Sequence, residues 1–282
     1  MLCITVLTAL TSSVPILTHV IRPSQVGDGV YAVTTLDNEV FVVRQNTGQV
    51  EVYDAVTFTL QHHIRVPAMG PRTSGITACA VNMCLYLSDY DNTLIHRVKL
   101  SGSNAVKKWS VASGPRDLSV NIEHNLVVAC LEANKLQEYT THGSLVREIC
   151  LQAGMTTPWH AIQLSTGDYV VSQWTSPGVV SVVGVDGQVV HSYGPSQTSD
   201  VGQMKNPSGL AVTKIDKILV ADPHNNRILL INRSTGCVQE LTLSVDGGIQ
   251  RPLGLCLDES RDRLYVGDWE RQRVLVFNGV RL

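Results

Sequence analysis

The chain has 282 residues, is 44% hydrophobic and 16% charged, and carries a net charge of −2. A chain of this length suits one sizeable domain and leaves little for a second. The balanced charge excludes a bulk electrostatic attraction to nucleic acid or to anionic lipid, so any such binding would need a local patch.

The first 13 residues, MLCITVLTALTSS, are apolar and uncharged. A signal peptide normally has Lys or Arg before its apolar run, and none is present here. The stretch before Pro15 is also too short to span a bilayer. We therefore expect residues 1–15 to be an N-terminal extension, either a strand or a weak signal-like segment. The seven cysteines have no metal-type spacing, which favours a reducing, cytoplasmic location; secretion and a disulfide framework are the alternative.

Residues 206–243 contain four apolar runs, which Gly, Pro, Asp, Asn and Ser separate. The runs predict four short strands of a meander: Ser208–Val212, Ile218–Ala221, Arg227–Asn232 and Val238–Leu243. A single meander leaves an apolar face exposed, so it needs neighbours of the same shape.

Copies of this unit occur along the whole chain. Prolines at 71, 115, 158, 207 and 252 mark five starts, and a sixth start lies near Asp28. A period in the forties with four strands per unit predicts an all-β, six-bladed β-propeller. The blades are expected at residues 28–69, 70–112, 113–156, 157–204, 205–249 and 250–282, the last together with 16–22, so that the propeller domain covers 16–282.

The last unit ends soon after its third strand, which would leave a seam in the ring. Residues 17–23, LTHVIRP, are similar to residues 60–67, LQHHIRVP, which form the outer strand of the first unit. We therefore expect Leu17–Arg22 to pair with Arg273–Phe277 and to close the ring without a covalent bond.

Two units carry a sharper motif. Pro207–Ile231 and Pro252–Phe277 share a Pro-x-Gly-Leu start, a Val-x-Asp second strand and an Arg five residues after the Asp. This pattern resembles the NHL-repeat family and is similar to the C-terminal propeller of tripartite-motif NHL proteins. The resemblance implies recognition of protein or RNA, and an adaptor-like role in ubiquitin-ligase-related pathways. No RING, B-box or coiled coil precedes Leu17, so we do not expect this chain itself to transfer ubiquitin.

A periodic charged set accompanies the motif: Asp89, Asp222, Asp268, Arg227 and Arg273. A carboxylate that ends the second strand can accept backbone N–H bonds and pair with an Arg of its own blade, so we expect a structural role for this set. In the other three units the Asp is replaced by Arg44, Cys130 or Gln173.

Propeller topology places two sets of loops on one face, namely those that precede each first strand and those that join second and third strands. We call this surface the Trp face. Its expected binding residues are Trp159, Trp174, Trp269, Arg72, Arg116, Arg271 and Tyr90. Trp and Arg dominate binding hot spots, which predicts a protein or peptide partner; the alternative is that each Trp fills a gap between blades. The Arg residues are interleaved with Asp91, Asp117, Glu132 and Glu270, so RNA binding is not favoured.

One pair departs from the repeat near the axis. Where we assign Gly29, Gly75, Gly209 and Gly254 to the other units, the third and fourth have Asp117 and His160. An Asp beside a His can act in acid–base chemistry or hold a ligand; the alternative is two loop residues that bond to backbone. Catalytic zinc needs about three converging ligands, and only His160 is expected near the axis.

The sequence therefore predicts a monomeric, non-enzymatic scaffold or substrate-recognition propeller with no catalytic constellation, no cofactor, no metal and no membrane partner. Two alternatives stay open. The first is a small-molecule or metal-dependent enzyme, lyase- or lactonase-like, with its axial site at Asp117 and His160. The second is RNA binding on the Trp face.

Overall fold

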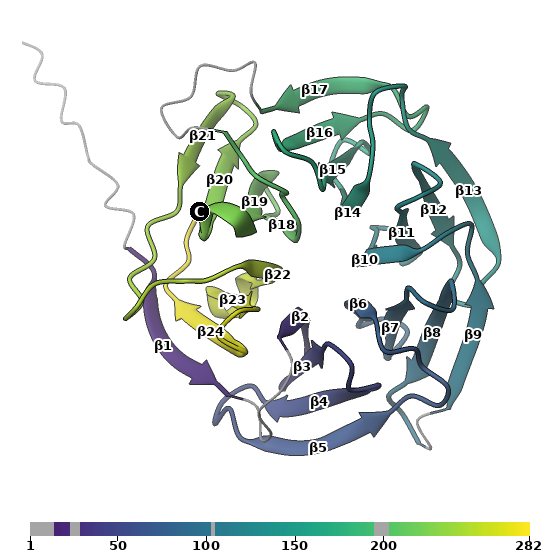
Figure 1. The fold of residues 1–282 in the computed structure, drawn as a ribbon. Helices are drawn as coiled ribbons and strands as arrows, with labels where there is room; N and C mark the ends of the chain where they lie inside the picture. The colour runs from purple at the N-terminus through teal and green to yellow at the C-terminus, as the bar shows by residue number, and fades with distance from the viewer. Residues whose placement is uncertain (1–13, 23–28, 103–104, 195–202) are drawn as a thin grey trace, which may run out of the picture.

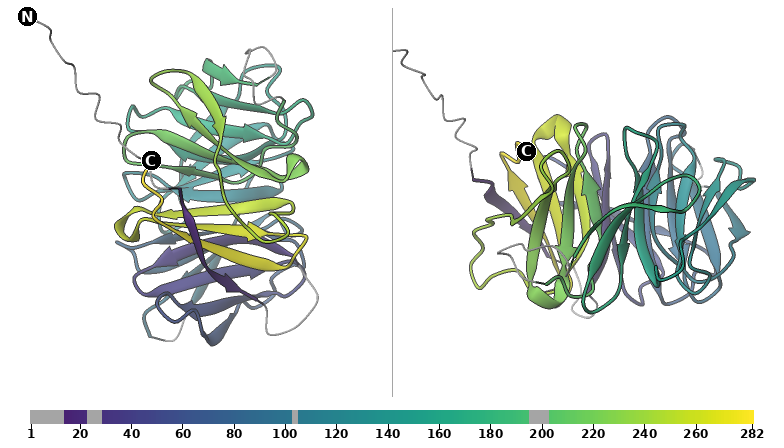
Figure 2. Two further views of the ribbon diagram at one scale, coloured as in Figure 1. Left: turned by 90° about the vertical axis from the view of Figure 1, so that its left-hand side faces the viewer. Right: turned by 90° about the horizontal axis from the view of Figure 1, so that it is seen from above.

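The computed structural model describes residues 14–22, 29–102, 105–194 and 203–282. Its strands form six four-stranded antiparallel sheets, which stand as blades around a central axis (Figure 1). The two turned views in Figure 2 show the strands running across the thickness of the ring. The predicted all-β, six-bladed propeller is confirmed.

The strands of each blade follow one another from the axis to the rim. The first three blades contain β2 (Val30–Leu36), β3 (Glu39–Arg44), β4 (Gln49–Asp54) and β5 (Leu60–Arg65); β6 (Thr73–Cys79), β7 (Cys84–Asp89), β8 (Leu94–Lys99) and β9 (Val106–Ser110); β10 (Pro115–Val120), β11 (Leu126–Cys130), β12 (Lys135–Tyr139) and β13 (Leu145–Cys150). The fourth and fifth contain β14 (Pro158–Gln163), β15 (Tyr169–Gln173), β16 (Val179–Val183) and β17 (Val189–Tyr193); β18 (Leu210–Val212), β19 (Lys217–Asp222), β20 (Arg227–Asn232) and β21 (Cys237–Glu240). The sixth contains β22 (Pro252–Asp258), β23 (Arg263–Asp268), β24 (Arg273–Asn278) and β1 (Ile16–Ile21).

The strand β1 closes the ring. It pairs antiparallel with β24, with Leu17 opposite Phe277 and Ile21 opposite Val274. Ile21 is 3% exposed and packs in a cluster that joins the sixth blade to the first. The predicted closure is therefore confirmed, with the strand shifted by one residue toward the N-terminus. The expected signal-like segment 1–13 lies outside the described residues.

Apolar clusters fill the spaces between neighbouring blades. One cluster joins Phe41 and Val52 of the first blade to Ile76 and Leu87 of the second, and the other blade boundaries have clusters of the same kind. The strands next to the innermost ones are buried on both sides because each blade packs between two others. No helix in the described ranges is long and apolar enough to cross a bilayer.

A polar pair joins the end of the second strand to the third strand in every blade. The pairs are Arg44 with Glu51 (2.8 Å), Asp89 with His96 (3.0 Å), Cys130 with Gln137 (3.4 Å), Gln173 with Ser181 (3.2 Å), Asp222 with Arg227 (2.8 Å) and Asp268 with Arg273 (2.8 Å). The units with a degenerate motif thus keep a bond from the end of the second strand, with different chemistry and with a partner two residues further along the third strand than Arg227 or Arg273.

Candidate binding face and axial cavity

Three aromatic residues occupy the same repeat position on the Trp face. Tyr90, Trp174 and Trp269 directly follow the second strands β7, β15 and β23. Tyr90 and Trp269 lean onto the next blade so closely that a Cβ on Gly114 or Gly29 would meet their rings. The absence of a side chain at these two glycines allows the aromatic rings to cover the blade boundaries.

A continuous row of rings and guanidinium groups, which we call the stack, crosses four blades on this face. The stack consists of Arg72, Tyr90, Arg116, Trp159, Trp174 and His224. The Arg72 and Arg116 guanidinium carbons lie 4.5 Å and 4.1 Å from the centre of the Tyr90 ring. The Arg116 carbon is 4.6 Å from the Trp159 ring, Trp159 stacks on Trp174 at 4.3 Å, and Trp174 meets His224 edge-on at 5.6 Å.

The members of the stack differ in how much surface they offer. Trp159 is 6% exposed, and Trp174, Tyr90 and Arg116 are half-buried. Arg72 and His224 are exposed at the two ends. Trp159 therefore supports the stack from below, and the half-buried members form the surface that a partner would contact.

Trp269 belongs to a second group on the same face. The Arg251 guanidinium carbon lies 4.3 Å from the centre of its ring, and Arg271 donates to the carbonyl oxygen of Gly247 at 2.7 Å. Because Trp269 lies against Gly29 of the first blade, its contacts match the gap-filling interpretation. The structure thus places Trp159, Trp174, Arg72, Arg116 and Tyr90 in one stack, and Trp269 and Arg271 outside it.

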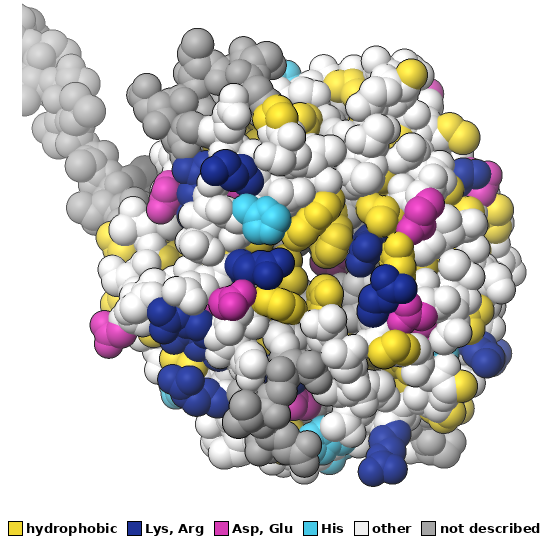
Figure 3. Space-filling view, viewed as in Figure 1, with side chains coloured by type: hydrophobic (Ala, Val, Ile, Leu, Met, Phe, Trp, Pro, Cys, Tyr) yellow, Lys and Arg dark blue, Asp and Glu magenta, His cyan; other side chains and the backbone are white. Residues whose placement is uncertain are grey.

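Most charges of the face are compensated within it. Arg72 Nε donates to Asp91 at 2.5 Å, Tyr90 Oη bonds to Glu132, and Arg251 lies 3.7 Å from Glu270. The hydrogen bond to Glu132 raises the pKa of Tyr90. Hydrophobic, basic and acidic side chains accordingly lie side by side around the central hollow in Figure 3.

Arg116 is the exception among these groups. Its guanidinium has no hydrogen bond or ion pair to any described residue, and its Nε atom is buried. Burial lowers the pKa of this guanidinium below its usual value. A desolvated cation that lies against ring faces can still bind an anionic partner.

The strand register corrects the predicted alignment at the axis. The pairings Val33 with Val42 and Leu255 with Val266 are equivalent, so Ala32, and not Gly29, occupies the position of Gly254. The six residues at this level are Ala32, Gly75, Asp117, His160, Gly209 and Gly254. A Cβ on Gly75 would lie 2.7 Å from the Arg116 carbonyl oxygen, and one on Gly254 would lie 2.7 Å from the Ala32 Cα atom. The glycines allow the inner strands to approach one another.

Asp117 and His160 lie close together at the axis, and their bonds are unlike those of an acid–base pair. Asp117 Oδ2 is 3.5 Å from His160 Nδ1. That nitrogen already accepts the Leu210 backbone N–H at 2.9 Å, while Nε2 lies 3.2 Å from the Leu118 carbonyl oxygen. Asp117 Oδ1 accepts the Leu118 N–H at 2.9 Å. Burial raises the pKa of Asp117. Through the bonds of His160 to Leu118 and Leu210, the pair also connects the third, fourth and fifth blades.

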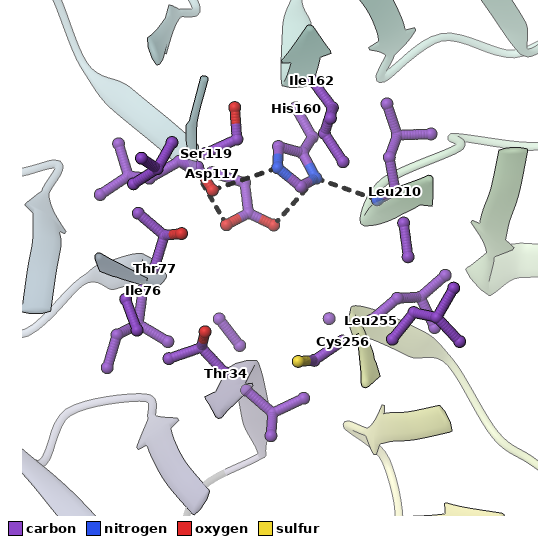
Figure 4. A pocket seen from close by; sticks show the side chains of 18 of the residues that line it. Thr34, Ile76, Thr77, Asp117, Ser119, His160, Ile162, Leu210, Leu255 and Cys256 are labelled. Carbon is purple, nitrogen blue, oxygen red and sulfur yellow. Dashed lines mark hydrogen bonds and ion pairs between the residues drawn. The ribbon is translucent and has the colours of Figure 1, made fainter. Parts of the chain in front are cut away.

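The two side chains line an axial cavity of about 230 Å³ (Figure 4). Further polar groups around the cavity are Thr34, Thr77, Ser119 and Cys256. Burial raises the pKa of the Cys256 thiol to about 11. The sequence interpretation missed these four residues. They lie two positions after the axial position in their strands, so correct strand register would have identified them. The described residues contain no cluster of three or more His, Cys, Asp or Glu that could hold a metal ion.

Comparisons with known proteins place this geometry among propellers. Residues 250–277, within the sixth blade, match the NHL repeat model, which supports the resemblance to that family. A search of curated protein sequences finds no match. Similar solved structures include a streptogramin B lyase (12% identity, 92% of this chain and 96% of that one, TM-score 0.65). They also include a catalytically inactive virginiamycin B lyase from Staphylococcus aureus with quinupristin (14% identity, 91% of this chain and 83% of that one, TM-score 0.67). A third is Kuenenia stuttgartiensis hydrazine synthase (19% identity, 88% of this chain and 76% of that one, TM-score 0.67). At these identities the likeness shows the fold alone.

Proposed function

We propose that this six-bladed propeller, which carries an NHL repeat, is a protein-interaction module whose Trp face binds an exposed segment of a partner protein. The stack is the observation that carries this proposal. It joins four blades into one surface and combines ring area with charged edges, which is the composition of binding hot spots. The rings are held by neighbouring blades, so little side-chain freedom is lost on binding. The scaffold or substrate-recognition role and the link to ubiquitin-ligase pathways belong to this proposal.

The test begins with a photo-crosslinking residue at position 224 on the Trp face, in cells that express the chain. The same residue at position 122 is the control, because Ile122 is 69% exposed in the loop after β10, on the opposite face. A partner cross-linked from position 224 alone is then purified. Its affinity should fall at least tenfold with Trp174→Ala and stay unchanged with Ile122→Ala. Equal binding by both variants would reject the Trp face as the interaction surface.

One observation favours a second candidate function, a small-ligand site in the axial cavity. Asp117 Oδ2 receives no hydrogen bond from a described residue, although the side chain is buried. A ligand with an ammonium group or another donor would satisfy this oxygen. Thermal-shift titration with small primary amines tests this candidate: a shift that Asp117→Asn abolishes supports it, and equal shifts in both proteins reject it.

A further inference from the structure

We propose that Arg116 is the anion-binding residue of the Trp face and takes a carboxylate of the partner segment, either an Asp or Glu side chain or a C-terminal carboxylate. This inference rests on the proposed function and adds the chemistry of the ligand. Three observations carry it: a guanidinium without a partner among the described residues, the position of the rings around it, and the pairing of the charges nearby.

The first observation is that Arg116 differs from the arginines next to it. Arg72 bonds to Asp91, Arg251 lies near Glu270, and Arg271 donates to a backbone carbonyl. Arg116 has no such partner among the described residues, and Glu132, the nearest acid of its own blade on this face, is engaged by Tyr90 and by the Gly114 N–H. Apart from the buried Nε, its N–H donors therefore remain available to a bound group.

The second observation concerns the direction from which a ligand can bind. Tyr90 comes from the preceding blade and Trp159 from the following one, and the Arg116 guanidinium lies between them, at 4.1 Å and 4.6 Å. The two rings occupy part of the space around the guanidinium, so a ligand has to reach its N–H groups from the directions that the rings leave open. A planar carboxylate suits a guanidinium, because its two oxygens can accept two parallel N–H bonds.

The third observation distinguishes a carboxylate from a nucleic-acid backbone. A run of phosphates needs several uncompensated cations, and beside Arg116 it would meet Asp91 and Glu132. A single carboxylate needs only one free arginine. Trp174, which stacks on the buried Trp159, provides apolar area for the residue that flanks the acid. The expected motif is an acidic group adjacent to an apolar or aromatic side chain.

The experiment is a selection of random dodecapeptides, displayed on phage with a free C-terminus on half of the library, against the intact propeller. Parallel selections use Arg116→Gln and the control Arg65→Gln, which removes an exposed arginine on the outer strand β5. The wild type and Arg65→Gln should enrich peptides with Asp, Glu or a terminal carboxylate. The Arg116→Gln selection should not. Melting curves confirm that the three proteins fold alike.

Synthetic peptides from the selection then complete a double-mutant cycle by fluorescence anisotropy. Changing the peptide acid to its amide should weaken binding to the wild type at least tenfold and have little further effect on Arg116→Gln. Arg116→Lys should recover only part of the affinity, because lysine keeps the positive charge but lacks the two parallel N–H donors of the guanidinium. Equal amide effects on wild type and Arg116→Gln would overturn the inference.

The remaining outcomes separate this inference from the proposed function. Peptides that depend on Trp174 but show no acidic preference would overturn the carboxylate site and leave the interaction face standing. Peptides that depend on neither Trp174 nor Arg116 would reject the face itself. Binding of single-stranded oligouridylate that Arg116→Gln abolishes, without acidic peptides, would replace the carboxylate with a phosphate and overturn the inference.

Discussion

The backbone N–H of Leu210 donates to Nδ1 of His160 at 2.9 Å, across the boundary between the fifth and fourth blades. Nδ1 is thus an acceptor, and the ring proton lies on Nε2, 3.2 Å from the Leu118 carbonyl oxygen. The imidazole has no proton to share with Asp117. A buried carboxyl that receives no proton from its neighbour favours its own neutral form.

Replacing Asp117 with Asn should therefore stabilise the fold at neutral pH, by about 1–3 kcal/mol. Burial raises the Asp117 pKa, so the folded state binds more protons than the unfolded state. The stability that protonated Asp117 contributes to the fold is fully present below its unfolded pKa of about 3.9, and it is lost as the pH rises through its folded pKa. Urea unfolding at pH 4.5 and 7.5 should show a larger gain from Asp117→Asn at pH 7.5. Asp246→Asn, at an exposed site, should show no gain, and a loss of stability in Asp117→Asn at pH 7.5 would contradict the prediction.

Closure of the ring predicts a strong difference between the two ends of β1. Ile21 is 3% exposed in the cluster that joins the sixth and first blades, whereas Ile16 is 68% exposed in the same strand. Ile21→Ala should lower the free energy of unfolding by about 2–4 kcal/mol because it leaves a cavity. Ile16→Ala should change it by less than about 0.5 kcal/mol. Denaturant titration of the two variants measures this difference, and equal losses would argue against β1 as a packed part of the blade.

The Asp222 network predicts destabilisation of the fifth blade without direct loss of binding. The buried carboxylate accepts the Lys205 N–H at 2.7 Å, Asn225 Nδ2 at 2.8 Å and Arg227 Nε at 2.8 Å. Asp222→Ala leaves these donors without their acceptor and should cost about 3 kcal/mol. Arg281→Ala removes an ion pair whose arginine is 76% exposed and should cost less than about 1 kcal/mol. If Asp222→Ala lost partner binding with unchanged melting, its role would be in recognition.

The cysteines offer a test by chemical reactivity. The six described thiols are free; Cys150 and Cys237 are exposed, and Cys79, Cys84 and Cys130 are buried. Burial raises the pKa of Cys130 to about 12 and that of Cys256 to about 11, and the thiolate is the reactive form. Among these six thiols, iodoacetamide at pH 7.5 should modify Cys150 and Cys237 first, and peptide mass spectrometry measures the order. Early modification of Cys256 would show that the axial cavity is more open than described.

The repeat spacing was sufficient to predict the blades and the closing strand, because period and turn residues are local signals. It was not sufficient for the axial level. Gly29 lies in a glycine-rich start, like Gly75, and only strand pairing shows that Ala32 occupies the equivalent place. The motif also did not predict the polar pairs of the weaker units. There Cys130 and Gln173 end the second strand in place of Asp, and each still bonds to a residue of the third strand. Whether Arg116 has an acidic partner depends on side-chain positions in three blades, which could not be predicted from the sequence.

The two tryptophans of the stack should respond differently to the same change. Trp159 is 6% exposed beneath Trp174, which is half-buried. Trp159→Ala opens a cavity between the Arg116 and Trp174 side chains and should cost about 3–5 kcal/mol. Trp174→Ala removes the outer ring of the pair and should cost less than half of that. Thermal and denaturant unfolding distinguish the two, with Trp109→Phe as a control on an outer strand. Since Trp159→Ala is expected to lower stability, a binding defect in that variant alone would not identify the partner surface, whereas one in Trp174→Ala would.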